Sequence, residues 1–233
     1  MSEIMSLTKR VQTQGEVLCL SKKENGGLGA SVYRCNLTWN SDKDLDIHAM
    51  LVGEDGKARG MKDFVAFTLG RTPEGLNNGR NPKYPDNFII HESGAIVHSP
   101  DVIDGSINTS GEDEFIEIDL KMLNNKAPWC KKVIITAGVF NEADDVPQLT
   151  LDMCGKAIVE IKADGNKELF EIVSNYVGDD TSIICEFEKV ERNGITDWRI
   201  NPVKKPIDQG IETSGLLKYV KQHMPSTTTV NRG

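Results

Sequence analysis

Residues 41–52 read SDKDLDIHAMLV and alternate between acidic or polar residues and apolar ones. In a β-strand, successive side chains point to opposite faces, so alternate residues share a face. The apolar row is Leu45, Ile47, Ala49 and Leu51. The opposite row is Asp42, Asp44, Asp46 and His48. The stretch therefore predicts a strand with one face in the core and a row of carboxylates at its start.

Eleven further segments have a two-residue period or are short apolar runs rich in β-branched residues, and Gly, Asn, Asp and Pro separate them. They are 16–20, 31–39, 64–68, 88–91, 95–98, 114–120, 132–140, 156–161, 169–173, 182–190 and 197–202. The segment 132–140 is apolar on both faces and is expected at the centre of a sheet. Asn193-Gly194 predicts a hairpin turn.

Helix is predicted in few places. Ser214 can cap a short helix that carries Leu216, Leu217 and Val220 on one face. A second short turn or helix is expected within 141–153. Many strands and few short helices predict an all-β fold, a two-layer β-sandwich. The expected organisation is an N-terminal extension at 1–15, the sandwich at 16–223 and a flexible tail at 224–233.

The composition limits the partners. The chain has 233 residues and a formal net charge of −8, so free nucleic acid is an unexpected partner because phosphate contact needs a basic surface. No stretch reaches the roughly 20 apolar residues of a membrane span, and Met1–Ser6 does not begin a signal peptide. The five cysteines are scattered, with no Cys-x-x-Cys pair. These features predict reduced thiols and a cytoplasmic protein.

Two acidic clusters suggest a metal. One is the Asp-x-Asp-x-Asp row in 42–46, and the other is the stretch from Asp101 to Glu114, which contains no basic residue. Carboxylates at such density repel one another, and Ca2+ accepts six to eight oxygen ligands. An EF-hand is excluded because its Gly and Glu positions hold Ile47 and Gly53. The alternative is a solvated acidic surface, and the clusters alone do not decide between the two.

The order of the segments resembles the TerD family of tellurium-resistance and stress-response proteins. The motifs that carry the resemblance are Leu37-Thr38-Trp39, Asp44-Leu45-Asp46-Ile47-His48-Ala49, Glu54-Asp55-Gly56-Lys57, Asp63-Phe64-Val65, Ile96-Val97-His98, Gly111-Glu112-Asp113-Glu114-Phe115, Val139-Phe140-Asn141-Glu142-Ala143, 187–194 with Trp198-Arg199, and Gly215-Leu216. The ordered set covers residues 17–220. It implies a β-sandwich that binds Ca2+ through the Asp-x-Asp strand and the acidic loop.

The ligand set that follows from this resemblance is Asp44, Asp46, Asp104, Glu112, Asp113, Glu114 and Glu142. The loop 103–110 is poorer in acids than the family pattern, which predicts one ion rather than two, or weaker binding.

Catalysis has little support in the sequence. The chain lacks Gly-x-Ser-x-Gly, a Walker loop and a dinucleotide fingerprint. His91 and His98 flank a predicted hairpin and could hold Zn2+, but no third ligand is apparent. The prediction is a non-enzymatic Ca2+-binding stress-response scaffold with protein partners or a homo-oligomeric state. The alternative is a structural assembly subunit, for example of a phage particle, which would place the protein in a virion.

Overall fold

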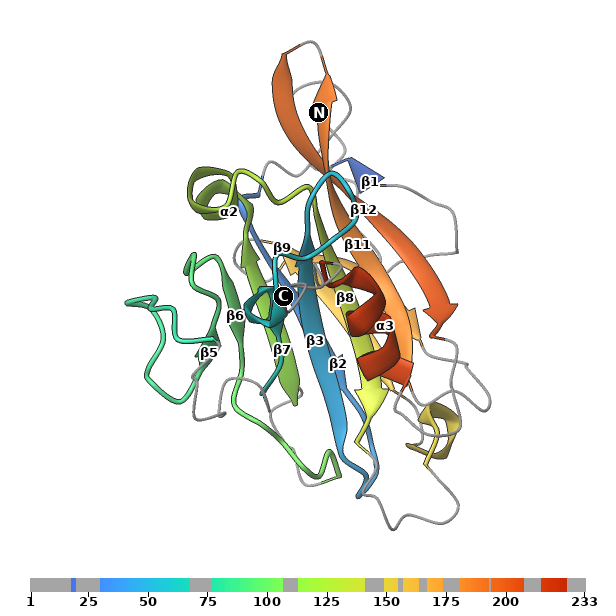
Figure 1. Ribbon diagram of the computed structural model, residues 1–233. Coiled ribbons are helices and arrows are strands. Elements are labelled where there is room, and N and C mark those ends of the chain that lie inside the picture. Colours follow the sequence, from blue (N-terminus) through green and yellow to red (C-terminus); the bar gives the residue numbers. More distant parts are fainter. Residues whose placement is uncertain are drawn as a thin grey trace, which may run out of the picture.

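The computed structural model describes residues 18–19, 30–67, 77–106, 113–140, 149–154, 157–163, 167–173, 181–192, 194–207 and 215–225. Two antiparallel sheets pack face to face (Figure 1). In spatial order, the first sheet holds β1 (Leu18–Cys19), β12 (Ile195–Pro206), β11 (Thr181–Arg192), β8 (Lys132–Val139), β3 (Leu45–Val52) and β4 (Phe64–Val65). The second holds β10 (Lys167–Val173), β9 (Ile158–Ala163), β2 (Val32–Thr38), β7 (Glu114–Asp119), β6 (Ile96–His98) and β5 (Ile89–Ile90). The predicted all-β sandwich is confirmed.

Each predicted strand overlaps one of these twelve, and β8 lies inside its sheet between β11 and β3. The main core fills the space between the sheets. The predicted apolar row of β3 faces this core, together with Val133, Ile135 and Phe187 of the neighbouring strands. Burial of one face of β3 fixes its register, because a shift of one residue would put the carboxylates inside.

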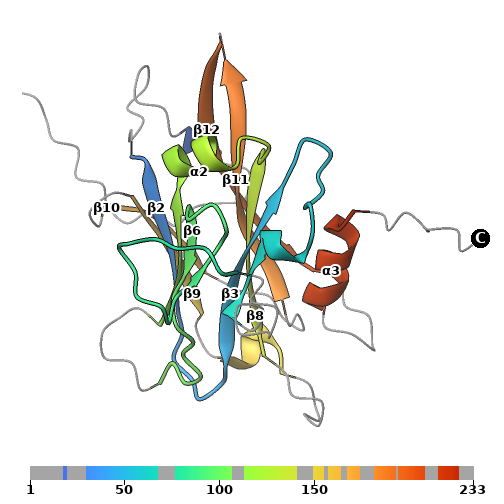
Figure 2. The same ribbon diagram turned by 60° about the vertical axis from the view of Figure 1, so that its left-hand side comes forward.

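Two α-helices occur among the described residues, α2 (Leu120–Lys126) and α3 (Gly215–His223), with short 3-10 turns at η1 (Met61–Asp63) and η2 (Leu151–Cys154). The helix α3 lies where Ser214 predicts one. It covers the outer face of the β3 sheet (Figure 2), where Val220 packs into a second apolar cluster with Met50 and Ile134. The α3 C-terminus is held by the Ala58 N–H, which donates to the His223 carbonyl at 2.7 Å.

The predicted N-terminal extension at 1–15 and residues 226–233 of the predicted tail lie outside the described residues. The four cysteines whose side chains are described, Cys35, Cys130, Cys154 and Cys185, are buried free thiols. Within the described ranges, no helix combines the length and apolar character needed to span a bilayer.

Candidate metal centre

One half of β3 has an edge that no described strand covers. The strand β4 pairs with β3 only at Ala49 and Met50, so the N-terminal half of β3 meets loop 99–106 instead. The Glu114 carboxylate lies between the two: its Oε2 accepts the Ile47 N–H at 3.1 Å and its Oε1 accepts the Val102 N–H at 3.2 Å. A side chain thus supplies the acceptor that a neighbouring strand would otherwise provide.

Three carboxylates converge beside this contact. Asp44, Asp46 and Asp101 each offer one oxygen, and these three oxygens lie within 4.8 Å of one another. Calcium binds oxygen at 2.3–2.6 Å, so oxygens up to about 5 Å apart can share one ion. The Asp44 Oδ1 atom is buried and has no hydrogen-bond partner among the described residues. An orphaned buried acceptor in a group of carboxylates suits a cation.

The electrostatics of the cluster point the same way. Burial, followed by the charges of Asp44 and Asp101, raises the pKa of Asp46 to about 7. Burial and Asp101 raise the pKa of Asp44 to about 6. Neither Asp44 nor Asp46 forms an ion pair with a described basic residue, and Lys43 pairs instead with Asp42 at 3.3 Å. Without a cation, these carboxyls are costly to ionise together.

Trp39 anchors loop 99–106 against the β2–β3 turn. Its Nε1–H donates to the Lys43 carbonyl at 2.7 Å. Gly105 packs on the indole so closely that a Cβ there would lie 2.5 Å from the Trp39 Nε1 atom. The Ser106 N–H also donates to the Ser41 carbonyl at 3.1 Å. These contacts hold Asp101 near the start of β3.

The structure brings together only part of the predicted ligand set. Asp44 and Asp46 lie in the cluster. Asp104 Oδ1 instead accepts from the Ser106 N–H and hydroxyl, at 2.9 and 2.6 Å. Asp113 Oδ2 accepts the Trp39 N–H at 3.0 Å, and Oδ1 of the same residue is buried without a described partner. Glu114 holds two backbone N–H groups, as described above.

Glu112 and Glu142 lie outside the described residues. Asp101 is the member of the cluster that the predicted ligand set lacks. It begins the acidic stretch that the sequence singles out, but no local spacing distinguishes it from Asp104. The tertiary packing of the loop brings Asp101, rather than Asp104, into the cluster.

A second group of potential ligands is already neutralised. Asp63, His91 and Glu92 lie close together. The buried Asp63 accepts from Arg59 Nη2 at 2.8 Å, and Glu92 pairs with Arg59 and Lys62 at 2.6 and 2.9 Å. Hydrogen bonds from His91 and Arg59 outweigh burial and lower the pKa of Asp63. Arg59 and Lys62 thus supply the positive charge that a bound metal ion would otherwise supply.

The same group contains a serine–histidine–aspartate relay. Ser93 Oγ lies 2.7 Å from His91 Nδ1, and Asp63 Oδ1 lies 3.2 Å from His91 Nε2. The order of groups is that of a serine hydrolase. However, the nearby N–H groups of Ser93, Gly94 and Ala95 donate to His91 Nδ1, to the His91 carbonyl and to Ser93 Oγ. With these donors used inside the turn, the geometry favours a structural network over an oxyanion site.

His98 is also buried, and its Nδ1 lies 2.6 Å from the Ser99 carbonyl oxygen. Burial lowers its pKa. His91 and His98 do not belong to a common group of potential metal ligands within the described part of the chain.

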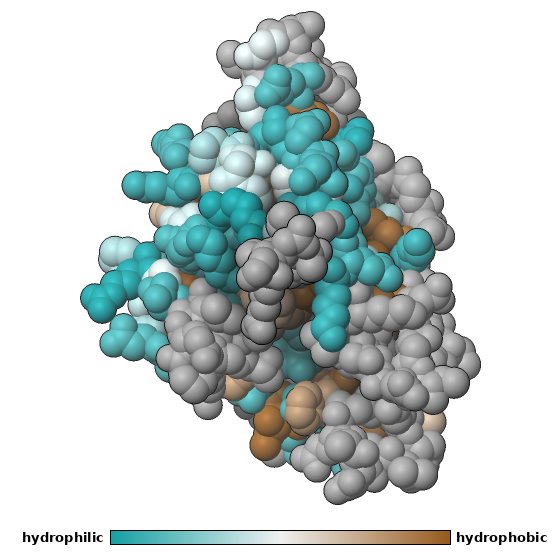
Figure 3. All heavy atoms as spheres, in the orientation of Figure 1, coloured by the Kyte–Doolittle hydropathy of each residue, from teal (hydrophilic) through white to brown (hydrophobic). Residues whose placement is uncertain are grey.

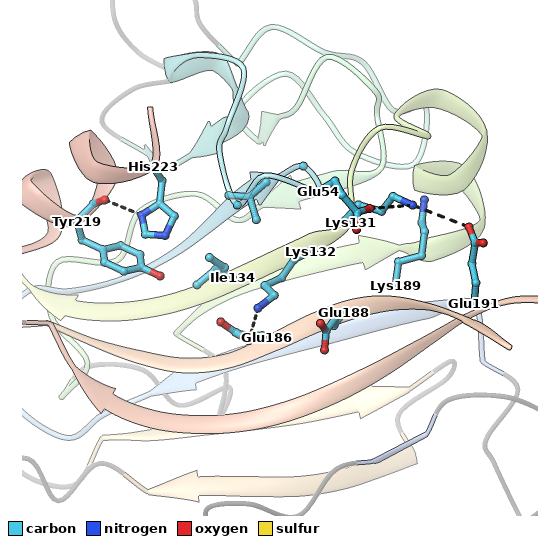
Figure 4. Close-up of a pocket in the computed structure, with 13 residues that line it drawn as sticks. Glu54, Lys131, Lys132, Ile134, Glu186, Glu188, Lys189, Glu191, Tyr219 and His223 are labelled. Carbon is cyan, nitrogen blue, oxygen red and sulfur yellow. Dashed lines mark hydrogen bonds and ion pairs between the residues drawn. The ribbon is translucent and has the colours of Figure 1, made fainter. Parts of the chain in front are cut away.

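A groove of about 510 Å³ runs between α3 and the outer face of β8 and β11 (Figure 4). Lysines and glutamates line its walls, and several of them form ion pairs. Lys132 lies 2.8 Å from Glu186, and Lys131 lies 3.3 Å from Glu54. Tyr219 and His223 of α3 close one side, with ring centroids 4.3 Å apart. Glu54, Glu186, Glu188 and Glu191 face Lys131, Lys132 and Lys189 in this lining, so the opposite charges nearly balance.

Comparisons with known proteins support the fold. SCO6318 from Streptomyces coelicolor A3(2), described as a homologue of the telluride resistance protein TerD, is 18% identical and has a TM-score of 0.57; the match covers 84% of this chain and 100% of that one. SAV2460, a protein of unknown function, is 18% identical with a TM-score of 0.56, over 85% and 99% of the two chains. No protein-family model and no curated protein sequence matches the chain. At this identity the likeness shows the fold alone, and it confirms the resemblance at that level: the chain has a TerD-like β-sandwich.

Proposed function

We propose that this protein binds one Ca2+ ion through Asp44, Asp46 and Asp101 and acts as a non-enzymatic, calcium-binding interaction module. The convergence of three carboxylate oxygens within 4.8 Å carries this proposal. They come from two segments more than 50 residues apart, so the grouping is a product of the fold. The buried, unpartnered Asp44 Oδ1 supports it independently.

The ligand chemistry favours calcium over other common ions. The cluster offers only carboxylate oxygens, which suit hard cations, and zinc sites normally use Cys or His. Mg2+ needs near-ideal octahedral geometry at 2.0–2.1 Å, whereas Ca2+ accepts irregular shells of six to eight oxygens. Three carboxylates leave room in such a shell for water or backbone oxygens.

The biological setting of the proposal comes from the fold. A structural neighbour is described as a homologue of a telluride resistance protein, and we extend a stress-response role to this chain as part of the proposal. The binding of one ion between β3 and loop 99–106 would hold this end of the sandwich in one shape, as an interaction module requires.

A structural assembly subunit is the second candidate, and one observation favours it. Among the described residues, three large apolar side chains are exposed, Ile103 by 67%, Met153 by 51% and Phe140 by 45%. Ile103 follows Asp101 by two residues, and the Phe140 N–H donates to the Asp44 carbonyl at 2.9 Å. Hydrophobic atoms gather at this lower end of the molecule in Figure 3.

Light scattering coupled to size exclusion, with and without Ca2+, separates a monomeric module from an obligate assembly.

Calorimetric titration of the chelator-treated protein with Ca2+ tests the proposed function. Wild type is expected to bind one ion, and Mg2+ is expected to bind more weakly. Asp46→Asn and Asp101→Asn are each expected to weaken binding at least tenfold, because a neutral amide replaces a charged ligand.

The matched control is Asp42→Asn. Asp42 belongs to the same Asp-x-Asp-x-Asp row, but its side chain is 74% exposed and pairs with Lys43. This variant is expected to bind Ca2+ as wild type does. Equal losses in all three variants would point to general surface charge, and no heat from wild type would leave the clusters as acidic surface.

A further inference from the structure

The two hydrogen bonds of Glu114 reach the residues that follow two of the proposed ligands. Oε2 accepts the N–H of Ile47, which follows Asp46, and Oε1 accepts the N–H of Val102, which follows Asp101. Each N–H belongs to the peptide unit that contains the carbonyl carbon of the preceding aspartate. A planar peptide unit that is held in place also holds that aspartate's Cα.

We propose that Glu114 is a positioning residue, one that sets the distance between Asp46 and Asp101 without binding the ion. This role rests on the proposed calcium site. Glu114 bridges two segments that share no strand pairing among the described residues. Its carboxylate stays outside the group of oxygens that lie within 4.8 Å of one another.

The surroundings of Glu114 suit such a bridge. Its side chain is fully buried, and the His98 Nε2 atom lies 4.0 Å from its Oε2. A buried carboxyl group is held in place by its hydrogen bonds because their loss would leave a desolvated polar group. Groups that orient metal ligands in this way typically change metal affinity by about 10–100-fold when they are mutated.

Two substitutions test the role in different ways. Glu114→Gln keeps the shape but places an amide donor against one of the two N–H groups. Glu114→Asp keeps the carboxyl group but is one methylene shorter, so it cannot reach both N–H groups. Each is expected to weaken Ca2+ binding about 10–100-fold. In the Ca2+-free protein, each is also expected to speed amide hydrogen exchange at Ile47 or Val102.

Glu117→Gln is the matched control. Glu117 lies on the same strand, is nearly as buried, and pairs with Lys83 at 2.8 Å and Arg34 at 2.9 Å, remote from the cluster. Its loss is expected to lower the melting temperature but to leave Ca2+ affinity and exchange at Ile47 and Val102 unchanged. A general loss of stability is thereby separated from a loss of positioning.

The outcomes distinguish three cases. Wild-type affinity in both Glu114 variants would overturn the positioning role while the calcium site stands. Weaker affinity with unchanged amide exchange would make Glu114 a direct ligand, which also overturns it. Wild-type protein that takes up no Ca2+ would remove the proposed function itself, and this role with it. If Glu114→Gln does not fold, Glu114→Asp gives the answer.

Discussion

At the scale of single residues, the candidate site is defined by carboxyls that are expensive to ionise. Asp46 is partly buried, and burial with two neighbouring aspartates raises its pKa to about 7. An ordinary aspartate in the unfolded chain titrates near 3.9. The folded protein therefore binds the Asp46 proton more tightly than the unfolded chain does. The stability that this proton contributes is complete below about pH 4 and is lost as the pH rises to about 7.

Asp46→Asn is therefore expected to have opposite effects with and without metal. In chelator, the variant should gain stability relative to wild type between pH 4 and pH 7.5, by up to about 4 kcal/mol, because asparagine cannot ionise. With saturating Ca2+ at pH 7.5, wild type should be the more stable protein. Urea unfolding of both proteins at pH 4 and at pH 7.5 measures the difference in the free energy of unfolding. Asp42→Asn should show neither effect, and a variant less stable than wild type in chelator at pH 7.5 would contradict the account.

At the scale of elements, loop 99–106 is the part that completes the cluster. Gly105 and Trp39 set its position, since the indole leaves no space for a Cβ at residue 105. The loop and β3 are joined through Glu114 and through the Ser106–Ser41 backbone contact rather than by strand pairing. Small shifts of the loop therefore move Asp101 relative to β3.

Gly105→Ala is expected to displace this loop. The added methyl group should destabilise the protein by about 1–3 kcal/mol, weaken Ca2+ binding and shift the Trp39 fluorescence. Gly60→Ala is the control, because no atom lies within 4 Å of the Cβ position there, and its effect on stability should stay within about 0.5 kcal/mol. Calorimetry and denaturant unfolding of both variants measure this. Unchanged Ca2+ affinity in Gly105→Ala would mean that the loop does not position the site.

Elements were largely predictable from the sequence, for a physical reason. Alternation in residues 45–52 and continuous apolar runs such as 132–139 reflect burial, which is a local property of each strand. The helix α2 was not predicted: Asp119 ends β7 and caps α2 by accepting the Met122 N–H at 2.8 Å, so strand and helix meet without a turn residue. Strand alternation also predicted that Asp44 and Asp46 share a face. Asp101 was not predicted as a ligand, nor Glu114 as a bridge, because both roles depend on contacts between segments far apart in the sequence.

At the scale of the whole molecule, the ion would fasten an otherwise weakly joined end of the sandwich. The rest of the fold has a continuous core between its sheets and a second cluster under α3. The net charge of −8 adds a general repulsion that a bound divalent cation reduces. Calcium should therefore stabilise the whole domain.

At a free Ca2+ concentration about 100 times the dissociation constant, linkage gives about 2.7 kcal/mol of added stability. For a domain of this size, this corresponds to a rise of roughly 5–10 °C in melting temperature. Thermal unfolding with Ca2+ and then with excess chelator measures the shift, which should be reversible. An identical shift with equal ionic strength of NaCl would attribute it to screening instead.

The most direct measurement is a crystal structure of the Ca2+-loaded protein with anomalous data. We expect an anomalous peak within 2.3–2.6 Å of oxygens of Asp44, Asp46 and Asp101, with Glu114 still hydrogen-bonded to the Ile47 and Val102 N–H groups. A peak elsewhere, or none beside these three aspartates at a saturating Ca2+ concentration, would contradict this expectation.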